Sequence, residues 1–114
     1  MEKILIKGII EISNNAIEEL IKEVLSVTKV RTRFASDAEF TLLYDDNKYE
    51  LYCHETLNGR FLLDLELNGG LSDGNDLIEK FKNNLSNKYY AFEWFEIDEN
   101  SEIVGEGFEI KSEN

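Results

Sequence analysis

The chain has few residues that could build a disulfide or a metal site, since its 114 residues include one cysteine and one histidine. One cysteine cannot form an internal bridge, and a lone thiol fits a reducing compartment. The same scarcity excludes a cluster of thiolate or imidazole ligands. Proline is absent, and Asn, Lys, Ile and Glu are abundant, a composition typical of AT-rich genomes that carries no functional information.

Long apolar runs are also missing. Lys7 and Glu11 interrupt the N-terminal run MEKILIKGIIEI. No segment reaches the roughly 18 apolar residues that a membrane span needs, and no small-residue cleavage site follows. We therefore expect no membrane association and a cytoplasmic location.

Basic residues are scarce, with 12 Lys and Arg against 24 Asp and Glu, a net charge of −12. Residues 1–35 carry six basic and five acidic side chains, whereas residues 36–114 carry six and nineteen. Such a surface repels nucleic-acid phosphates and anionic lipid and attracts basic proteins. The composition predicts a basic protein partner, and no direct nucleic-acid binding.

Two segments have helical periodicity. A helix of about 15 residues is expected after Asn15, which with Glu18 resembles a capping box, and its apolar residues form one stripe: Ile17, Leu20, Ile21, Val24 and Leu25. A second helix is expected at about 75–86, capped by Asn75 or Asp76, with Leu77, Ile78, Phe81 and Leu85 apolar.

Residues 38–68 alternate between apolar and polar with a period of two, which predicts three strands. A two-residue loop at Asp46–Asn47 pairs Tyr44 with Tyr49, Leu42 with Leu51 and Phe40 with Cys53. For the next turn, a two-residue Asn-Gly loop would place Asp64 opposite Cys53. A three-residue loop with Gly59 left-handed instead pairs Cys53 with Leu63 and Leu51 with Leu65, and this register keeps apolar side chains on one face.

Further strands are expected at 3–12, with Gly8 as a bulge or close-approach point, and at about 88–98 and 102–110. The order β-α-β-β-β-α-β-β predicts a single α+β domain over residues 1–114. It has a largely antiparallel sheet of about six strands, with both helices packed on one face.

No residue pattern specifies catalysis or a cofactor. Cys53 and His54 are adjacent on a strand, so they point to opposite faces and cannot form a nucleophile–base pair. His54 lies on the outer face near Glu39, where it could act as a general base or weak metal ligand, although a solvated histidine is more typical there.

Residues 73–76 lack the calcium-loop spacing, and the glycines at 69, 70 and 74 lack a phosphate-binding motif. The basic residues Lys29, Arg31 and Arg33 could bind an anion, but pairing with carboxylates is more typical of so acidic a chain.

The sequence favours a non-enzymatic, acidic, intracellular binding protein that neutralises or regulates a basic partner such as a toxin or nuclease. Bacterial immunity proteins and phage-type inhibitors have this composition and size. Two contact surfaces are predicted. One is the C-terminal segment, with carboxylates around an exposed turn and an aromatic residue that could equally belong to the core; the other is the outer sheet face. The candidate residues are Glu96, Asp98, Glu99, Glu102 and Trp94 in the first, and Tyr52, His54, Asp64 and Glu66 in the second.

Two alternatives remain. The chain could be a structural or homodimeric subunit that uses an open sheet face or edge. It could also be a small ligand-binding domain or enzyme with a pocket between sheet and helices, using His54 or the aromatic cluster at 89–94.

Overall fold

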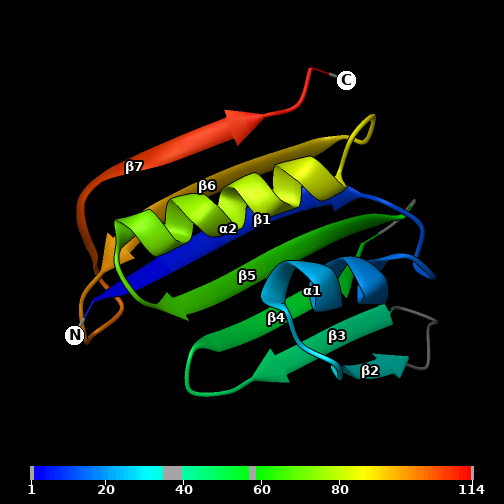
Figure 1. Cartoon of the computed structure of the whole chain (residues 1–114), viewed down its shortest axis with the longest axis horizontal. Helices are drawn as coiled ribbons and strands as arrows, with labels where there is room; N and C mark the ends of the chain where they lie inside the picture. The colour runs from blue at the N-terminus through cyan, green and yellow to red at the C-terminus, as the bar shows by residue number, and fades with distance from the viewer. Residues whose placement is uncertain (1, 35–39, 57–58, 114) are drawn as a thin grey trace.

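The computed structural model describes residues 2–34, 40–56 and 59–113 and shows a seven-stranded antiparallel sheet with both helices on one face (Figure 1). The sheet order is β2-β3-β4-β5-β1-β6-β7. The predicted α+β class is confirmed, with one strand more than expected because the basic segment after the first helix pairs as β2. The elements are β1 (Lys3–Glu11), α1 (Ile17–Leu25), β2 (Arg31–Phe34), β3 (Phe40–Asp45), β4 (Tyr49–Glu55), β5 (Arg60–Asn68), α2 (Leu71–Asn84), β6 (Tyr90–Ile97) and β7 (Ile103–Lys111).

Helix α1 buries the predicted apolar stripe, but it is shorter than predicted, with nine residues. It begins after Ala16, and no side chain caps its first turn. The predicted capping box at Asn15 is wrong, because Asn15 Oδ1 instead accepts a hydrogen bond from the Ser13 hydroxyl at 2.6 Å. The helix ends where Ser26 adopts a left-handed conformation, with φ of 58°. Burial of the stripe therefore holds this helix.

Helix α2 begins at Leu71, four residues before the first predicted cap. The carboxylate of Asp73 accepts a hydrogen bond from the Gly70 N–H at 3.1 Å and so satisfies a free donor of the first turn. The prediction of Asn75 or Asp76 as the cap is wrong. Asn75 Oδ1 accepts the indole N–H of Trp94 at 3.0 Å and ties the helix to β6.

The predicted register of the β4–β5 hairpin is confirmed. Cys53 lies opposite Leu63, and Leu51 opposite Leu65. Gly59 has φ of +70°, the left-handed conformation that the three-residue loop requires. The apolar side chains of these two opposed pairs consequently face the helices.

The predicted register of the β3–β4 hairpin is wrong by two residues. The loop is Asn47–Lys48, because the Asp46 N–H donates to the carbonyl of Tyr49 at 2.9 Å. The Asp46 carboxylate fixes this turn by accepting the N–H groups of Lys48 and Tyr49, both at 2.7 Å. Since a shift of two residues preserves the side-chain faces, the apolar face was predicted correctly although Cys53 lies opposite Leu42 rather than Phe40.

Gly8 is a close-approach point and not a bulge. A Cβ atom at this position would lie 2.5 Å from Cδ1 of Phe92 on the neighbouring strand. Phe92 is buried and packs against Phe81 of α2, with 4.9 Å between the ring centroids. The glycine therefore gives this ring the space to lie over the centre of the sheet.

Candidate functional site

Neither helix covers the second face of the sheet, which we call the uncovered face (Figure 1). The strand pairing arranges its side chains in three rows that run across the strands. The first row is Asp45, Glu50, Glu66, Leu5 and Phe95; the second is Arg31, Leu43, Tyr52, Asp64, Lys7, Glu93 and Glu109; the third is Arg33, Thr41, His54, Leu62, Ile9, Ala91 and Lys111.

The first row places three carboxylates on three adjacent strands. Glu50 lies directly opposite Asp45 on one side and Glu66 on the other. Asp45 forms an ion pair with Arg31, with 3.8 Å between its Oδ2 atom and Nη2 of the arginine. Within the described residues, Glu50 and Glu66 have no ion pair. Like charges directly opposite each other destabilise a sheet, so this pair costs stability in the isolated chain.

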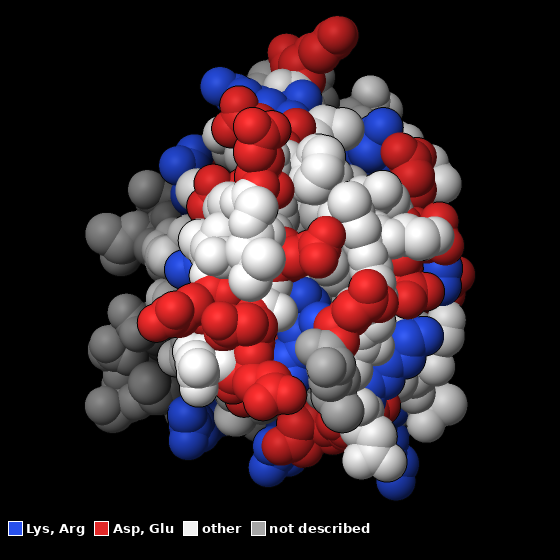
Figure 2. Space-filling view, turned by 90° about the vertical axis from the view of Figure 1, so that its left-hand side faces the viewer, with Lys and Arg blue, Asp and Glu red and all other residues white. Residues whose placement is uncertain are grey.

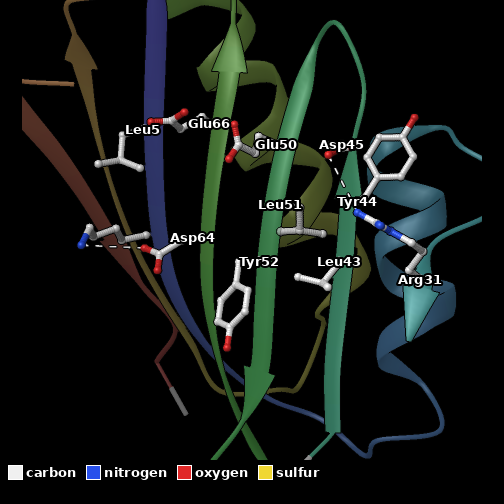
Figure 3. Close-up of a pocket in the computed structure, with 11 residues that line it drawn as sticks. Leu5, Arg31, Leu43, Tyr44, Asp45, Glu50, Leu51, Tyr52, Asp64 and Glu66 are labelled. Carbon is white, nitrogen blue, oxygen red and sulfur yellow. Dashed lines mark ion pairs between the residues drawn. The ribbon is translucent and has the colours of Figure 1, made fainter. Parts of the chain in front are cut away.

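The second row centres on Tyr52, whose side chain is 44% exposed. It lies between Leu43 and Asp64. Asp64 Oδ1 is 3.8 Å from Nζ of Lys7, as the dashed line in Figure 3 marks. This row therefore offers an aromatic side chain beside a carboxylate that is already paired.

The third row contains His54, which lies between Thr41 and Leu62 rather than between carboxylates. Its ring centroid is 5.4 Å from that of Tyr52. Its Nδ1 atom is buried and has no hydrogen-bond partner among the described residues. The predicted neighbour Glu39 lies outside the described residues. No group of three or more metal-ligating side chains occurs in the described part of the chain.

Two hollows lie side by side on the uncovered face. One, of about 450 Å³, lies over the first two rows (Figure 3), and the other, of about 830 Å³, lies toward β6 and β7. Lys7 and Asp64 line both. Together the hollows are lined by six acidic and three basic side chains: Asp45, Glu50, Asp64, Glu66, Glu93 and Glu109 against Lys7, Arg31 and Lys111. Both hollows lie over the uncovered face, whereas the ligand-binding alternative predicts a pocket between the sheet and the helices.

The predicted residues of the outer face thus lie together. Tyr52, His54, Asp64 and Glu66 share the uncovered face with Glu50, as expected from period two. Sequence reasoning missed Lys7. For Arg31 it favoured pairing with a carboxylate, which the contact with Asp45 confirms, but it did not place Arg31 beside these residues, because β1 and β2 become their neighbours only through the sheet order. The period-two spacing of the charged residues Lys3, Lys7 and Glu11, which alternate with the buried Ile4, Ile6 and Ile10, was a signal that could have indicated the face of Lys7.

The C-terminal candidates occupy a different place. Asp98, Glu99 and Glu102 lie at the β6–β7 turn, and the exposed Glu96 lies near the end of β6. Figure 2 looks at this side of the molecule and shows acidic side chains over much of its surface. Asp98 shapes the turn itself, since its Oδ1 atom accepts the N–H groups of Asn100 at 2.8 Å and of Glu102 at 3.0 Å.

Trp94 belongs to the core, which is the alternative that the sequence left open. It is 8% exposed, and it stacks on Phe108 with 5.7 Å between centroids. Its side chain faces the helices and hydrogen-bonds to Asn75. In this structure it is therefore a buried residue of β6 and not an exposed aromatic anchor.

Cys53 and His54 lie on opposite faces of β4, as predicted. Cys53 is fully buried, and burial raises the pKa of its thiol to about 12. A thiolate is the nucleophilic form of cysteine, so this side chain acts as a small apolar group of the core.

The chain matches no family model, no curated protein and no solved structure. Across the described residues, neither helix has the length and apolar character that a bilayer crossing would require.

Proposed function

We propose that this protein is an intracellular binding protein that neutralises or regulates a basic protein partner, as an immunity protein or inhibitor does. The uncovered face is its contact surface. The observation that carries the proposal is the opposed pair Glu50 and Glu66, which has no cation among the described residues. A lysine or arginine of a partner placed between these carboxylates would relieve their repulsion.

The neighbouring side chains suit such a contact. Tyr52 and Leu62 are 44% and 37% exposed and lie one and two rows from the carboxylate pair. Aromatic anchors surrounded by polar groups carry much of the energy of protein interfaces. The net charge of −12, together with the acidic β6–β7 turn, would attract a basic partner from a distance and raise the association rate.

The experiment compares two variants with the same change in charge. Glu50→Lys with Glu66→Lys alters the uncovered face. Glu23→Lys with Asp76→Lys alters exposed positions on α1 and α2. Affinity capture from the native host with the wild-type chain supplies the partner, and association kinetics at several ionic strengths then compare all three proteins.

The proposal predicts that the uncovered-face variant slows association by about tenfold or more, whereas the helix-face variant changes it by about twofold. Equal effects of both variants would mean that only net charge matters, and would overturn the site. Light scattering of the free protein is the further control. A wild-type dimer that Glu50→Lys with Glu66→Lys disrupts would identify a second copy as the occupant and would also overturn the proposal.

A further inference from the structure

Among the described residues, strand β7 ends the sheet, because β6 is the one strand that pairs with it there. It is nine residues long, and eight of its residues, two of them glycines, are exposed while Ile110 is half-buried. Three apolar side chains stand open to solvent: Ile103 at 57%, Val104 at 50% and Phe108 at 43%. A long edge strand with exposed apolar residues is a template for another strand.

The backbone shows which groups face outward. The Ser112 N–H donates to the carbonyl of Tyr90 at 2.9 Å, so Ser112 faces β6. Because the direction alternates along an antiparallel strand, Ile110 and Phe108 also bond toward β6. Glu109 and Lys111 therefore direct their N–H and C=O groups to the free edge.

A bulge limits the straight part of this edge. Phe108 lies opposite Trp94 and Val104 opposite Glu96, so β7 has three residues where β6 has only Phe95. Gly105 has φ of +84° at this bend. The regular stretch that remains for pairing is residues 108–111.

This stretch has a different chemistry on each face. On the helix side, Phe108 stacks on Trp94 at an interplanar angle of 22°. On the uncovered face, Glu109 lies directly opposite Glu93, and neither has an ion pair among the described residues. A strand added beside β7 would place one residue next to Glu109 and its two neighbours next to Phe108 and Ile110.

We propose that β7 binds an extended segment of the basic partner as an eighth strand. A lysine or arginine of that segment lies beside Glu109, and apolar side chains lie beside Phe108 and Ile110. Main-chain hydrogen bonds to residues 109 and 111 supply affinity, and the alternating side chains supply selectivity. The proposal rests on the proposed function for the charge of the partner, but it concerns a surface distinct from the Glu50–Glu66 pair.

A second copy of the chain fits this edge less well. Four of the five charged residues in 102–113 are glutamates, and each chain has a net charge of −12. Antiparallel self-pairing can bring Glu109 opposite Lys111 of the second copy. In that register, however, Phe108 lies opposite Ser112 of the second copy and its exposed ring gains no apolar partner.

The test uses a ten-residue peptide of alternating lysine and valine, blocked at both ends, titrated into the isotope-labelled chain. NMR shifts should concentrate at residues 108–111, and the Glu109 and Lys111 amides should exchange more slowly with solvent. Glu109→Pro removes an outward N–H group while leaving the bonds to β6, and should raise the dissociation constant about tenfold. Glu109→Gln removes the charge alone and should raise it about threefold.

A second pair of variants guards against misfolding at position 109. Lys111→Pro should weaken peptide binding, whereas Lys111→Gln should leave it unchanged or strengthen it, because the lost charge repels the peptide. Equal behaviour of each proline variant and its glutamine counterpart would overturn strand addition in favour of charge attraction. Dimerisation without peptide shifts at β7 would assign the edge to a second copy.

One comparison separates this proposal from the proposed function. Glu50→Lys with Glu66→Lys should leave peptide binding at β7 within about twofold of wild type at 0.15 M salt, because charges beyond a Debye length are screened. If that variant lost peptide binding and Glu109→Pro kept it, the peptide would bind on the uncovered face. This result would overturn the edge proposal but not the proposed function. Loss only in Glu109→Pro would support the edge even if the native partner ignored Glu50 and Glu66.

Discussion

Removing the charge of Glu50 should stabilise the protein, although most substitutions destabilise proteins. Glu50 is exposed and lies directly opposite the half-buried Glu66. Glu50→Gln keeps the shape and polarity of the side chain and removes the repulsion. If the carboxylate pair serves binding, its repulsion lowers the free energy of unfolding of the isolated chain. Neutralising one member of the pair should then raise that free energy.

The size of the gain follows from the pairing geometry. Directly opposed residues of an antiparallel pair have Cβ atoms about 5 Å apart. With about 6 Å between the charges, the repulsion is about 0.7 kcal/mol in water. Salt at about 0.1 M reduces this to about 0.4 kcal/mol, whereas partial burial of Glu66 raises it. We therefore expect Glu50→Gln to gain about 0.5 kcal/mol at low ionic strength.

Urea unfolding at about 0.02 M and 1 M salt measures the effect, since screening should remove most of the gain. Asp76→Asn, which removes a charge from α2 on the other side of the sheet, is the control and should gain less. Combining Glu50→Gln with Glu66→Gln completes a double-mutant cycle, in which the second substitution should add nothing to the first. Additive effects, or a loss of stability at low salt, would refute the reasoning.

Three further outcomes are expected. Native Cys53 should react with a thiol reagent at least about 100-fold more slowly than the unfolded chain at pH 8, because burial raises its pKa to about 12; rapid labelling would contradict its burial. Gly8→Ala should cost about 1–3 kcal/mol in urea unfolding, because the added Cβ would lie 2.5 Å from the Phe92 ring; an unchanged midpoint would show that this ring moves freely. The Tyr44 hydroxyl donates to Asp46 at 2.5 Å, which lowers the pKa of Asp46 and raises that of Tyr44. The lowered pKa stabilises the fold above the ordinary carboxyl pKa and the raised one stabilises it below the ordinary phenol pKa, so Tyr44→Phe should flatten the stability profile below about pH 4 and above about pH 10; an unchanged profile would refute the pair.

The faces of the strands and the helix stripes could be predicted because burial fixes the period. The β4–β5 register could also be predicted, since the alternative would have placed Asp64 opposite Cys53. The β3–β4 register could not, because two registers that differ by two residues bury the same side chains. The turn at Asp46 distinguishes them, through the N–H that Asp46 donates to the Tyr49 carbonyl and the two N–H groups that its carboxylate accepts.

The candidate site was predicted in part for a related reason. Tyr52, Asp64 and Glu66 belong to one hairpin, so local alternation already places them together. Arg31 and Lys7 come from β2 and β1, and their proximity depends on the order of strands in the sheet. Asn75 is of a residue type that often caps helices, but its hydrogen-bond partner is the indole of Trp94, nineteen positions along the chain. Such tertiary contacts leave no periodic pattern in the sequence.

The position of β1 in the sheet determines the order in which the strands can pair during folding. This first strand lies between β5 and β6, and Lys3 pairs with both Asn68 and Ile97. Strands β2 to β5 form a meander of neighbours that can pair as soon as each is made. Strand β1, by contrast, stays unpaired until β5 has been made and keeps one free edge until β6 has been made. Its pairing is also slow, because it closes long loops. During synthesis, β1 is therefore made before both of its neighbours and gains the second one only after β6, so until then an edge of this apolar strand is exposed to other chains.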